Sequence, residues 1–420
     1  MSERLEVLIS GEVSGQMFNL CVWDPSNGTS LKTYKGNSTK SKTLAFVGNS
    51  FIVSGQPHKP LLNVWHLHKH EQKPLKYVTP GVLQSLTVSP CGHFMVGTVE
   101  ERIYLWQTAS GKLLKIITNG HFQKINLTKF TSDGSHFLTA GEDGNVLMWP
   151  LDNASQPRHA WSQHSLGVTD FHIGFGGLDA RVFTASKDHT ANIYLASAGS
   201  FLLSVEFPAP LMSITADSAE ENLFVGTNSG QIYTAGLKNP PRDLKMSIEQ
   251  DAGSVFKGHT QAVTSLSVSL DGLTLASGGC DCEVRLWHIK SRQCVRVVPH
   301  KGAVTTLHFM IPKAGMLRPE DYRQDVSFSL LEKTAVESNI LASDIYAVDV
   351  FSPTDSDGYY KEPTARELLQ RQPKVAVAAL PLPQDEDGTD VGGSSEEIQR
   401  LKQINHKLYE AAVQSVLSMQ

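Results

Sequence analysis

The sequence predicts an all-β protein: a seven-bladed β-propeller closed by strands from its N- and C-terminal parts, followed by a flexible tail and a C-terminal α-helix. An aromatic residue after a short apolar run recurs at intervals of 42, 41, 43, 45, 39 and 54 residues, close to the length of one propeller blade. The seven positions are Trp23, Trp65, Trp106, Trp149, Tyr194, Tyr233 and Trp287. Between them, short runs of alternating apolar and polar residues are separated by turn pairs, as expected for antiparallel strands.

The clearest unit lies within residues 258–298. It begins with a Gly-His pair and ends at Trp287, which follows His259 by 28 residues. The unit resembles the WD repeat, a family in which His, Ser or Thr, Asp and Trp form a hydrogen-bonded tetrad inside each four-stranded blade. The resemblance implies that the Ser277 hydroxyl accepts from the indole of Trp287. It also implies that His259 links this hydroxyl to Asp281.

Two further units carry most or all of this pattern. One is complete, and its members are His121, Thr139, Asp143 and Trp149. The next has a tyrosine in the tryptophan position, and its members are His164, Thr184, Asp188 and Tyr194. A phenol cannot reproduce the geometry of an indole N–H, so we expect an altered network there. The units ending at Trp65, Trp106 and Tyr233 lack most of the tetrad and are expected to rely on apolar alternation.

The two ends of the repeat region complement each other. His300 and residues 303–310 repeat the start of a blade, but no tryptophan follows them. Residues 5–35 offer three strands with no first strand before them. Pairing of these segments would close the ring and remove two open sheet edges. We therefore expect a propeller over residues 1–311.

After the propeller, residues 312–394 are expected to form a mostly irregular acidic tail, and residues 395–420 an amphipathic helix. Ser394-Ser395-Glu396-Glu397 is a typical helix start. One face of the helix is apolar, formed by Ile398, Leu401, Ile404, Leu408, Ala412, Val416 and Met419. This stripe must be buried somewhere. It either docks back onto the propeller or binds a partner or a second copy, and the acidic linker favours the second interpretation.

Composition excludes several classes of function. The chain has 420 residues and a formal net charge of −5, so it lacks the basic balance of a nucleic-acid-binding protein, and direct RNA binding is not expected. No apolar run has the length of a membrane helix. The five cysteines, with no secretory signal at the N-terminus, indicate reduced thiols in the cytosol or nucleus.

No motif predicts a catalytic, cofactor or metal site. The Ser-His-Asp trios resemble a hydrolase triad, but the WD-repeat resemblance places each hydroxyl under a tryptophan inside a sheet. His66, His68 and His70 follow a blade tryptophan, and no cysteine or acidic cluster completes a metal site. Cys280 and Cys282 are separated by one residue instead of two. The sequence therefore predicts a binding platform and not an enzyme.

Longer strings carry a more specific resemblance. They are residues 135–149, 169–190, 250–272 and 401–412, and they resemble the WD-repeat subunits of rixosome-type complexes. This resemblance implies a non-enzymatic scaffold in biogenesis of the large (60S) ribosomal subunit, supporting processing of the second internal transcribed spacer and late nuclear maturation. The segment between the propeller and the last helix departs from that family.

The resemblance also implies partners and a location. The expected partners are a PELP/Rix-type helical-repeat protein, a TEX/Ipi-type subunit, pre-60S particles with the midasin ATPase, and a second copy bound through the C-terminal helix. The expected location is the nucleus, in nucleolus and nucleoplasm, with the cytoplasm as a further site. Two alternatives remain: a chromatin-associated factor in replication licensing, and a generic WD-repeat adaptor such as a ubiquitin ligase substrate receptor.

Overall fold

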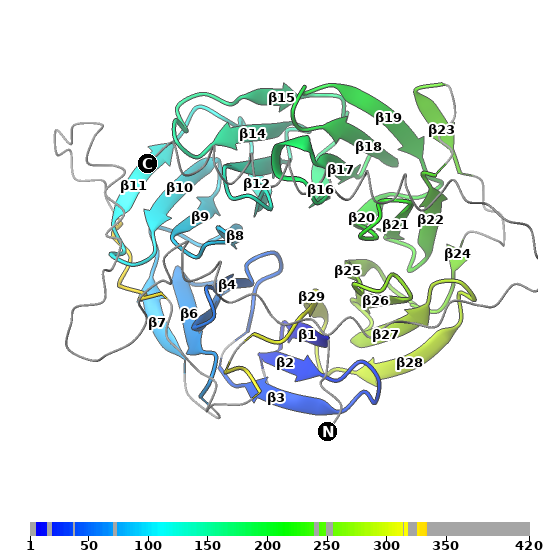
Figure 1. The fold of residues 1–420 in the computed structure, drawn as a ribbon, viewed down its shortest axis with the longest axis horizontal. Helices are drawn as coiled ribbons and strands as arrows, with labels where there is room; N and C mark the ends of the chain where they lie inside the picture. Colours follow the sequence, from blue (N-terminus) through cyan, green and yellow to red (C-terminus); the bar gives the residue numbers. More distant parts are fainter. Residues whose placement is uncertain are drawn as a thin grey trace, which may run out of the picture. The chain divides into compact units, whose positions relative to one another are not determined.

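Seven sheets form a ring in the computed structural model (Figure 1), and their strands pair antiparallel except for one parallel strand at the edge of one sheet. The structure describes residues 6–14, 19–36, 38–69, 74–238, 243–248, 255–313, 315–317 and 326–333. The prediction of an all-β, seven-bladed propeller is confirmed. The chain divides into two compact units, Met1–Ala347 and Val348–Gln420, and the ring belongs to the first. The predicted C-terminal helix, with its stripe from Ile398 to Met419, lies outside the described residues.

Six blades follow one another along the chain. The first two are β4 (Ala45–Val47), β5 (Phe51–Gly55), β6 (Leu61–His66) and β7 (Leu75–Val78), then β8 (Ser85–Val88), β9 (Phe94–Val99), β10 (Arg102–Gln107) and β11 (Leu113–Ile117). The next two are β12 (Ile125–Phe130), β13 (His136–Gly141), β14 (Val146–Pro150) and β15 (His159–Trp161), then β16 (Val168–Ile173), β17 (Arg181–Ser186), β18 (Thr190–Leu195) and β19 (Phe201–Glu206), with the 3-10 turn η1 (Gly177–Asp179) after β16. The last two are β20 (Leu211–Ala216), β21 (Asn222–Thr227), β22 (Ile232–Gly236) and β24 (Val255–Phe256), then β25 (Val263–Val268), β26 (Thr274–Gly279), β27 (Glu283–His288) and β28 (Cys294–Pro299).

The seventh blade joins the two ends of the repeat region, as the sequence predicts. It consists of β29 (Val304–Met310), β1 (Val7–Glu12), β2 (Leu20–Trp23) and β3 (Ser30–Tyr34), in that order. β29 and β1 pair antiparallel, with Leu8 opposite Phe309 and Ser10 opposite Leu307. All six residues of β1 are buried. We call this sheet the closure blade.

Each interface between neighbouring blades holds its own apolar core, because apolar side chains of adjacent sheets pack against each other. Trp287, for example, packs against Phe224 and Phe256 of the preceding blade, and its ring centroid lies 5.6 Å from that of Phe256. Burial of one large apolar side chain stabilises a fold by roughly 1.5–3 kcal/mol. The blades therefore stabilise one another through a continuous series of cores.

A belt of side-chain hydrogen bonds connects the innermost strands across the blade interfaces. Each belt residue donates to a backbone carbonyl of the next blade: Asn126 to Val168 at 2.9 Å, Thr169 to Leu211 at 3.0 Å, Ser213 to Val263 at 2.9 Å and Thr264 to Val304 at 2.6 Å. At the closure blade, the hydroxyls of Thr39 and Thr305 lie 3.2 Å apart. Short polar side chains near the channel thus satisfy backbone acceptors that would otherwise be buried unpaired.

Lys32 is a buried lysine between the closure blade and the blade of β4–β7. Lys32 is only 3% exposed. Its ammonium group donates to the carbonyls of Leu67 at 2.6 Å and Met316 at 3.1 Å. Burial lowers the pKa of Lys32 to about 8. The charge is therefore held by carbonyl dipoles and by the nearby ring of Tyr34, 5.6 Å away.

This lysine predicts a pH dependence of stability. Between pH 8 and the ordinary lysine pKa of roughly 10.4, the unfolded chain binds more protons at residue 32 than the folded chain. The contribution of Lys32 to the free energy of unfolding should therefore rise with pH in that window. Compared with Lys32→Met, the wild-type chain should gain stability from pH 7 to pH 10 in chemical denaturation. A constant difference between the two proteins over that range would contradict the low pKa of Lys32.

Candidate interaction surface

The four residues singled out in the blade of β25–β28 are brought together. His259 donates from Nδ1 to Asp281 Oδ2 at 2.8 Å, because a carboxylate can only accept. Its Nε2 lies 2.7 Å from the Ser277 hydroxyl, and Trp287 Nε1 donates to that same hydroxyl at 2.8 Å. Burial lowers the pKa of His259, which favours the neutral imidazole that this arrangement needs. Asp281 also accepts from the backbone N–H of Thr260 at 3.1 Å.

The blade of β12–β15 holds the same arrangement. His121 Nε2 lies 2.8 Å from the Thr139 hydroxyl, and Trp149 Nε1 donates to this hydroxyl at 3.0 Å. His121 Nδ1 lies 3.0 Å from Asp143 Oδ2. Hydrogen bonds from His121 and the N–H of Asn145 help to hold the pKa of Asp143 below its usual range against the opposing effect of burial.

The blade of β16–β19 has two of the three side-chain contacts of a tetrad. His164 lies 3.0 Å from Asp188 Oδ2 and 2.8 Å from the Thr184 hydroxyl. Tyr194 is fully buried in the tryptophan position, and among the described residues its hydroxyl has no hydrogen-bond partner of good geometry. Burial raises the pKa of Tyr194 to about 12. The phenol therefore fills the volume of the indole without completing the network.

The hydroxyls in these networks are buried beneath aromatic rings. Ser277, Thr139 and Thr184 are all fully buried, so a substrate cannot approach their oxygen atoms. A nucleophile needs access to the reacting carbonyl as well as a neighbouring base. The geometry therefore favours a structural role, in which each network fixes the turn between the second and third strands of its blade.

A fourth network of this type spans the closure blade. The sequence pattern does not predict it, because its residues come from both ends of the repeat region. Trp23 Nε1 donates to the Ser10 hydroxyl at 2.7 Å, and His300 Nε2 lies 2.8 Å from the same oxygen. Glu12 reproduces one contact of the aspartate, since its carboxylate accepts from the N–H of Lys301 at 3.3 Å, and His300 Nδ1 lies 3.2 Å from the Val298 carbonyl. Ser10 precedes Trp23 by 13 residues instead of ten. Two residues of the sequence could have indicated this network. They are His300, which Pro299 and not a glycine precedes, and Ser10 in the first strand of the chain.

Trp106 is satisfied in a different way. Gly97 occupies the position that corresponds to Ser277, two residues beyond the residue paired with the tryptophan. With no hydroxyl available, Trp106 Nε1 donates to the backbone carbonyl of Glu332 at 2.9 Å. Residues 326–333, here called the strap, therefore supply what this blade lacks.

The strap packs on the outer part of the blades of β4–β7 and β8–β11 (Figure 1). Val326 and Leu331 are buried in the core between these blades. The ring of Phe328 stacks on Tyr77 with 5.3 Å between centroids. The sequence predicts a mostly irregular segment after residue 311, and the strap forms neither helix nor strand, but it is an integrated part of the ring's packing.

Comparisons with known proteins agree with these networks. The model of the WD domain, G-beta repeat, matches residues 111–150 and 252–288, and these ranges contain the two complete tetrads. WD repeat-containing protein 18 from Rattus norvegicus is 40% identical over 330 residues, covering 76% of each chain. The zebrafish (Danio rerio) protein of that name is 35% identical over 99% of each chain. The chain belongs to the WD repeat-containing protein 18 family. Pre-rRNA-processing protein IPI3 from Yarrowia lipolytica is 31% identical, over 67% of this chain and 71% of its own length.

In this WD repeat-containing protein 18 family member, the connectors that hold the tetrad histidines, before the first strand of each blade, carry exposed apolar side chains. Phe122 is 91% exposed and directly follows His121, and its backbone N–H donates to Asp143 at 3.3 Å. Leu166 is 53% exposed and follows His164 by two residues. Both lie on rigid connectors, so a partner could cover them at little cost in conformational entropy.

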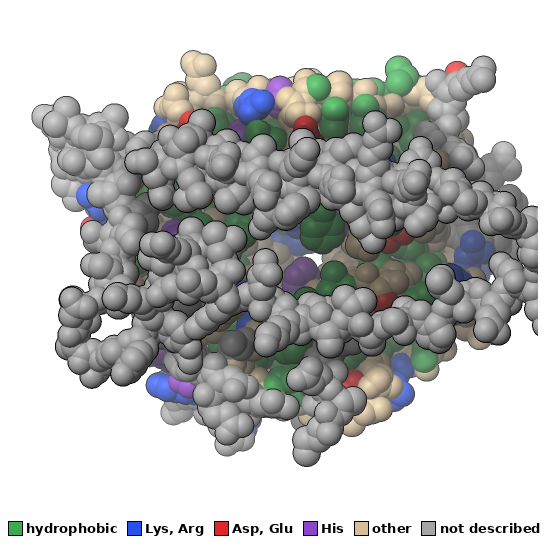
Figure 2. All heavy atoms as spheres, viewed as in Figure 1, with side chains coloured by type: hydrophobic (Ala, Val, Ile, Leu, Met, Phe, Trp, Pro, Cys, Tyr) green, Lys and Arg blue, Asp and Glu red, His purple; other side chains and the backbone are tan. Residues whose placement is uncertain are grey.

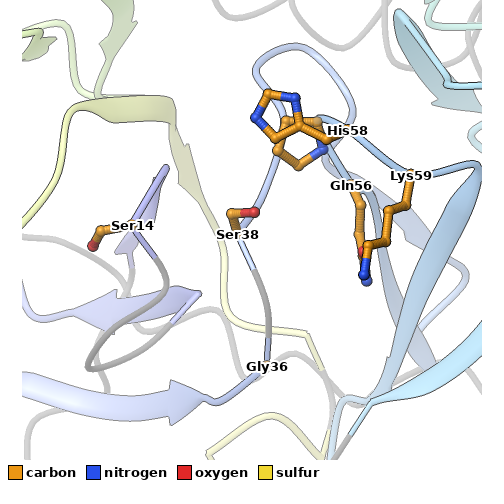
Figure 3. Close-up of a pocket in the computed structure, with 7 residues that line it drawn as sticks. Ser14, Gly36, Ser38, Gln56, His58 and Lys59 are labelled. Atoms are coloured by element: carbon orange, nitrogen blue, oxygen red, sulfur yellow. The ribbon is translucent and has the colours of Figure 1, made fainter.

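A polar pocket lies between the closure blade and the turn after β5 (Figure 3). Its volume is about 370 Å³, and its lining comprises Ser14, Gly36, Ser38, Gln56, Pro57, His58 and Lys59. Sites for small apolar ligands or cofactors are usually lined by aliphatic and aromatic side chains. This lining suits a polar segment of a partner better than a small apolar molecule.

The ring is open at its centre, where histidine and basic side chains are visible (Figure 2). Asp170 on β16 forms ion pairs with Lys42 at 2.7 Å and Lys129 at 3.6 Å. Burial, with a contribution from Lys129, lowers the pKa of His172 to about 3. This imidazole is thus neutral at physiological pH. His308 on β29 is exposed.

The histidines near the end of β6 do not form a metal site in the described part of the chain. His66 and His68 contact edge to face, with 5.6 Å between ring centroids, and His70 lies outside the described residues. Within the described ranges, no group of three or more His, Cys, Asp or Glu side chains has the geometry of a metal site. In the same part of the chain, no helix has the length and apolarity needed to cross a membrane.

Proposed function

We propose that this protein is a non-enzymatic scaffold subunit of a rixosome-type complex in large ribosomal subunit biogenesis. The similarity to a protein named for pre-rRNA processing, IPI3 of Yarrowia lipolytica, over two thirds of the chain carries this proposal. The closed ring supports it, because a propeller held by seven inter-blade cores presents rigid surfaces for several partners at once.

The proposal extends to the step of ribosome assembly at which the protein acts and to its partners. The protein supports removal of the second internal transcribed spacer and late nuclear maturation of pre-60S particles, in nucleolus and nucleoplasm. It binds a PELP/Rix-type helical-repeat protein and a TEX/Ipi-type subunit, and it acts together with midasin. Residues 1–311 together with the strap form the scaffold, the rest of residues 312–394 connects, and residues 395–420 form the helix that pairs with a second copy. The net charge of −5 favours protein contacts over direct contacts with RNA.

Depletion of the protein tests the processing role. Cells depleted of the chain should accumulate precursor rRNA that retains the second internal transcribed spacer, measured by hybridisation with a spacer probe. Re-expression of the full chain should restore processing. Unchanged precursor levels after complete depletion would count against the proposal.

The proposed pairing through the C-terminal helix makes a separate prediction. Replacement of Leu401, Ile404 and Leu408 with Asp should abolish self-association, because a carboxylate on the apolar stripe cannot be buried without a large cost. Sedimentation should show the mass of a monomer, with an unchanged melting temperature of the propeller. Substitutions off the stripe, Lys402→Ala and Lys407→Ala, serve as the matched control. A wild-type sedimentation mass for the triple variant would refute the pairing.

A further inference from the structure

The outermost strand of one blade, β28, presents an uncovered apolar edge. Val295 is 64% exposed and Val297 is 43% exposed, whereas Val298 packs into the core shared with the closure blade. β28 is the last strand of its sheet, and no other described strand pairs with its outer edge. Exposed apolar edges of this kind are usually protected in natural proteins, because they invite pairing with other chains.

The neighbouring blade leaves this edge open. Its fourth strand, β24 (Val255–Phe256), has only two residues. The residues that precede it along the chain form β23 (Lys245–Ser247), which pairs with β19 of the blade before (Figure 1). Within the described residues, the blade next to β28 therefore has little outer strand with which to cover Val295 and Val297.

The same ring shows how such an edge is used. β23 adds to β19 in parallel as a fifth strand. Ser204 N–H donates to the Leu244 carbonyl at 2.8 Å, and the Glu206 carbonyl accepts from Ile248 N–H at 2.9 Å. The partly buried side chain of Met246 packs against the adjacent core. One outer edge of this propeller thus receives an extended segment from elsewhere in the chain.

Register shows that β28 offers the same two backbone groups. In both blades the register shifts just before the aromatic residue of the third strand, and Leu203 is opposite Ile193 as Arg296 is opposite Leu286. Val297 therefore corresponds to Ser204, and Pro299 to Glu206. On β19 the groups that bond to β23 are the N–H of Ser204 and the carbonyl of Glu206. The missing N–H of Pro299 is consequently no obstacle to strand addition.

The charges around β28 indicate the chemistry of an incoming strand. Residues 289–300 contain Lys290, Arg292 and Arg296 and no acidic residue. Lys290 and Arg292 are exposed. Arg296 is engaged, since it donates to the carbonyls of Asn27 at 2.6 Å and Ser26 at 3.1 Å. An extended segment with apolar residues for the valines and carboxylates for the two exposed cations, Lys290 and Arg292, complements this edge.

We propose that β28 is a docking site for an extended apolar and acidic segment of a partner protein, which adds in parallel as β23 adds to β19. This inference rests on the proposed scaffold function, because it assigns one surface through which the scaffold holds a partner. Main-chain hydrogen bonds at Val297 and Pro299 supply the pairing, and the side chains supply the specificity.

Hydrogen exchange on the native complex tests the proposal. The tagged full-length chain is purified with its partners, and exchange of the peptide containing residues 294–299 is compared with that in the isolated full-length chain. The Val297 amide should exchange at least tenfold more slowly in the complex. Equal rates in the two samples would overturn the proposal. So would protection in the isolated chain that grows with its concentration, because that result indicates edge pairing between two copies.

A proline substitution separates this inference from the scaffold function itself. Val297→Pro removes the outward N–H from an edge that tolerates proline. Thr33→Pro, at the corresponding position of β3, is the matched control. Val297→Pro should weaken binding of one identified subunit at least tenfold with an unchanged melting temperature, and Thr33→Pro should not. If the Val297→Pro complex retains every subunit, the docking site is refuted and the proposed scaffold function still stands. Protection of the β28 amides in a complex that contains no ribosome assembly proteins would support the docking site and contradict the proposed function.

Discussion

Trp287→Ala is expected to lower the free energy of unfolding by about 3–5 kcal/mol, the usual cost of removing a buried tryptophan. Trp287 is almost fully buried and packs against Phe256. Its loss leaves a cavity between two blades and also removes the donor to Ser277. Chemical denaturation with a fluorescence or circular dichroism readout measures the change.

Two matched variants separate packing from hydrogen bonding. Trp287→Phe keeps much of the apolar volume and removes the N–H, so its cost should be smaller than that of the alanine variant. Ser277→Ala removes the shared hydroxyl and should cost about 1–3 kcal/mol, because a buried indole donor loses its acceptor. An alanine variant as stable as the wild type would contradict the assignment of the tetrad at this blade.

A chain that ends at residue 303 is expected to lose its cooperative fold. The truncation removes β29 and with it the buried side chains of Val304, Leu307 and Phe309. Each contributes roughly 1.5–3 kcal/mol, and together they are comparable with the whole net stability of about 5–15 kcal/mol typical of a domain. The truncation also exposes the edge of β1, so the chain should aggregate.

The control for this truncation is a chain that ends at residue 333. It keeps β29 and the strap, so it should melt in a single transition near the temperature of the full chain. Size-exclusion chromatography and thermal melting compare the two. A cooperative transition of the 1–303 chain at the temperature of the 1–333 chain would show that β29 does not close the ring.

The sequence predicts the ring and its closure because both depend on local, repeated patterns. The period of aromatic residues counts the blades, and a first strand at residues 303–310 requires the three strands of residues 5–35. Proximity of His259, Ser277 and Asp281 is predictable for the same reason, since one blade holds them all at a fixed spacing.

Other features depend on partners that sequence spacing does not reveal. The network of Ser10 and His300 joins residues 290 positions apart, and its carboxylate comes from a glutamate, Glu12. The acceptor for Trp106 is a backbone carbonyl of the strap, and a carbonyl has no sequence signature. β23 is a three-residue strand with little apolar alternation, so its addition to β19 follows only from the three-dimensional arrangement.

The most direct measurement of the scaffold function is affinity purification of the tagged full-length chain from nuclear extract, with quantification of the proteins that co-purify. We predict near-stoichiometric recovery of a PELP/Rix-type and a TEX/Ipi-type subunit, together with large-subunit assembly proteins and midasin. Recovery of origin-licensing proteins or of a ubiquitin ligase as the main stoichiometric partner, without ribosome assembly proteins, would contradict the proposed function.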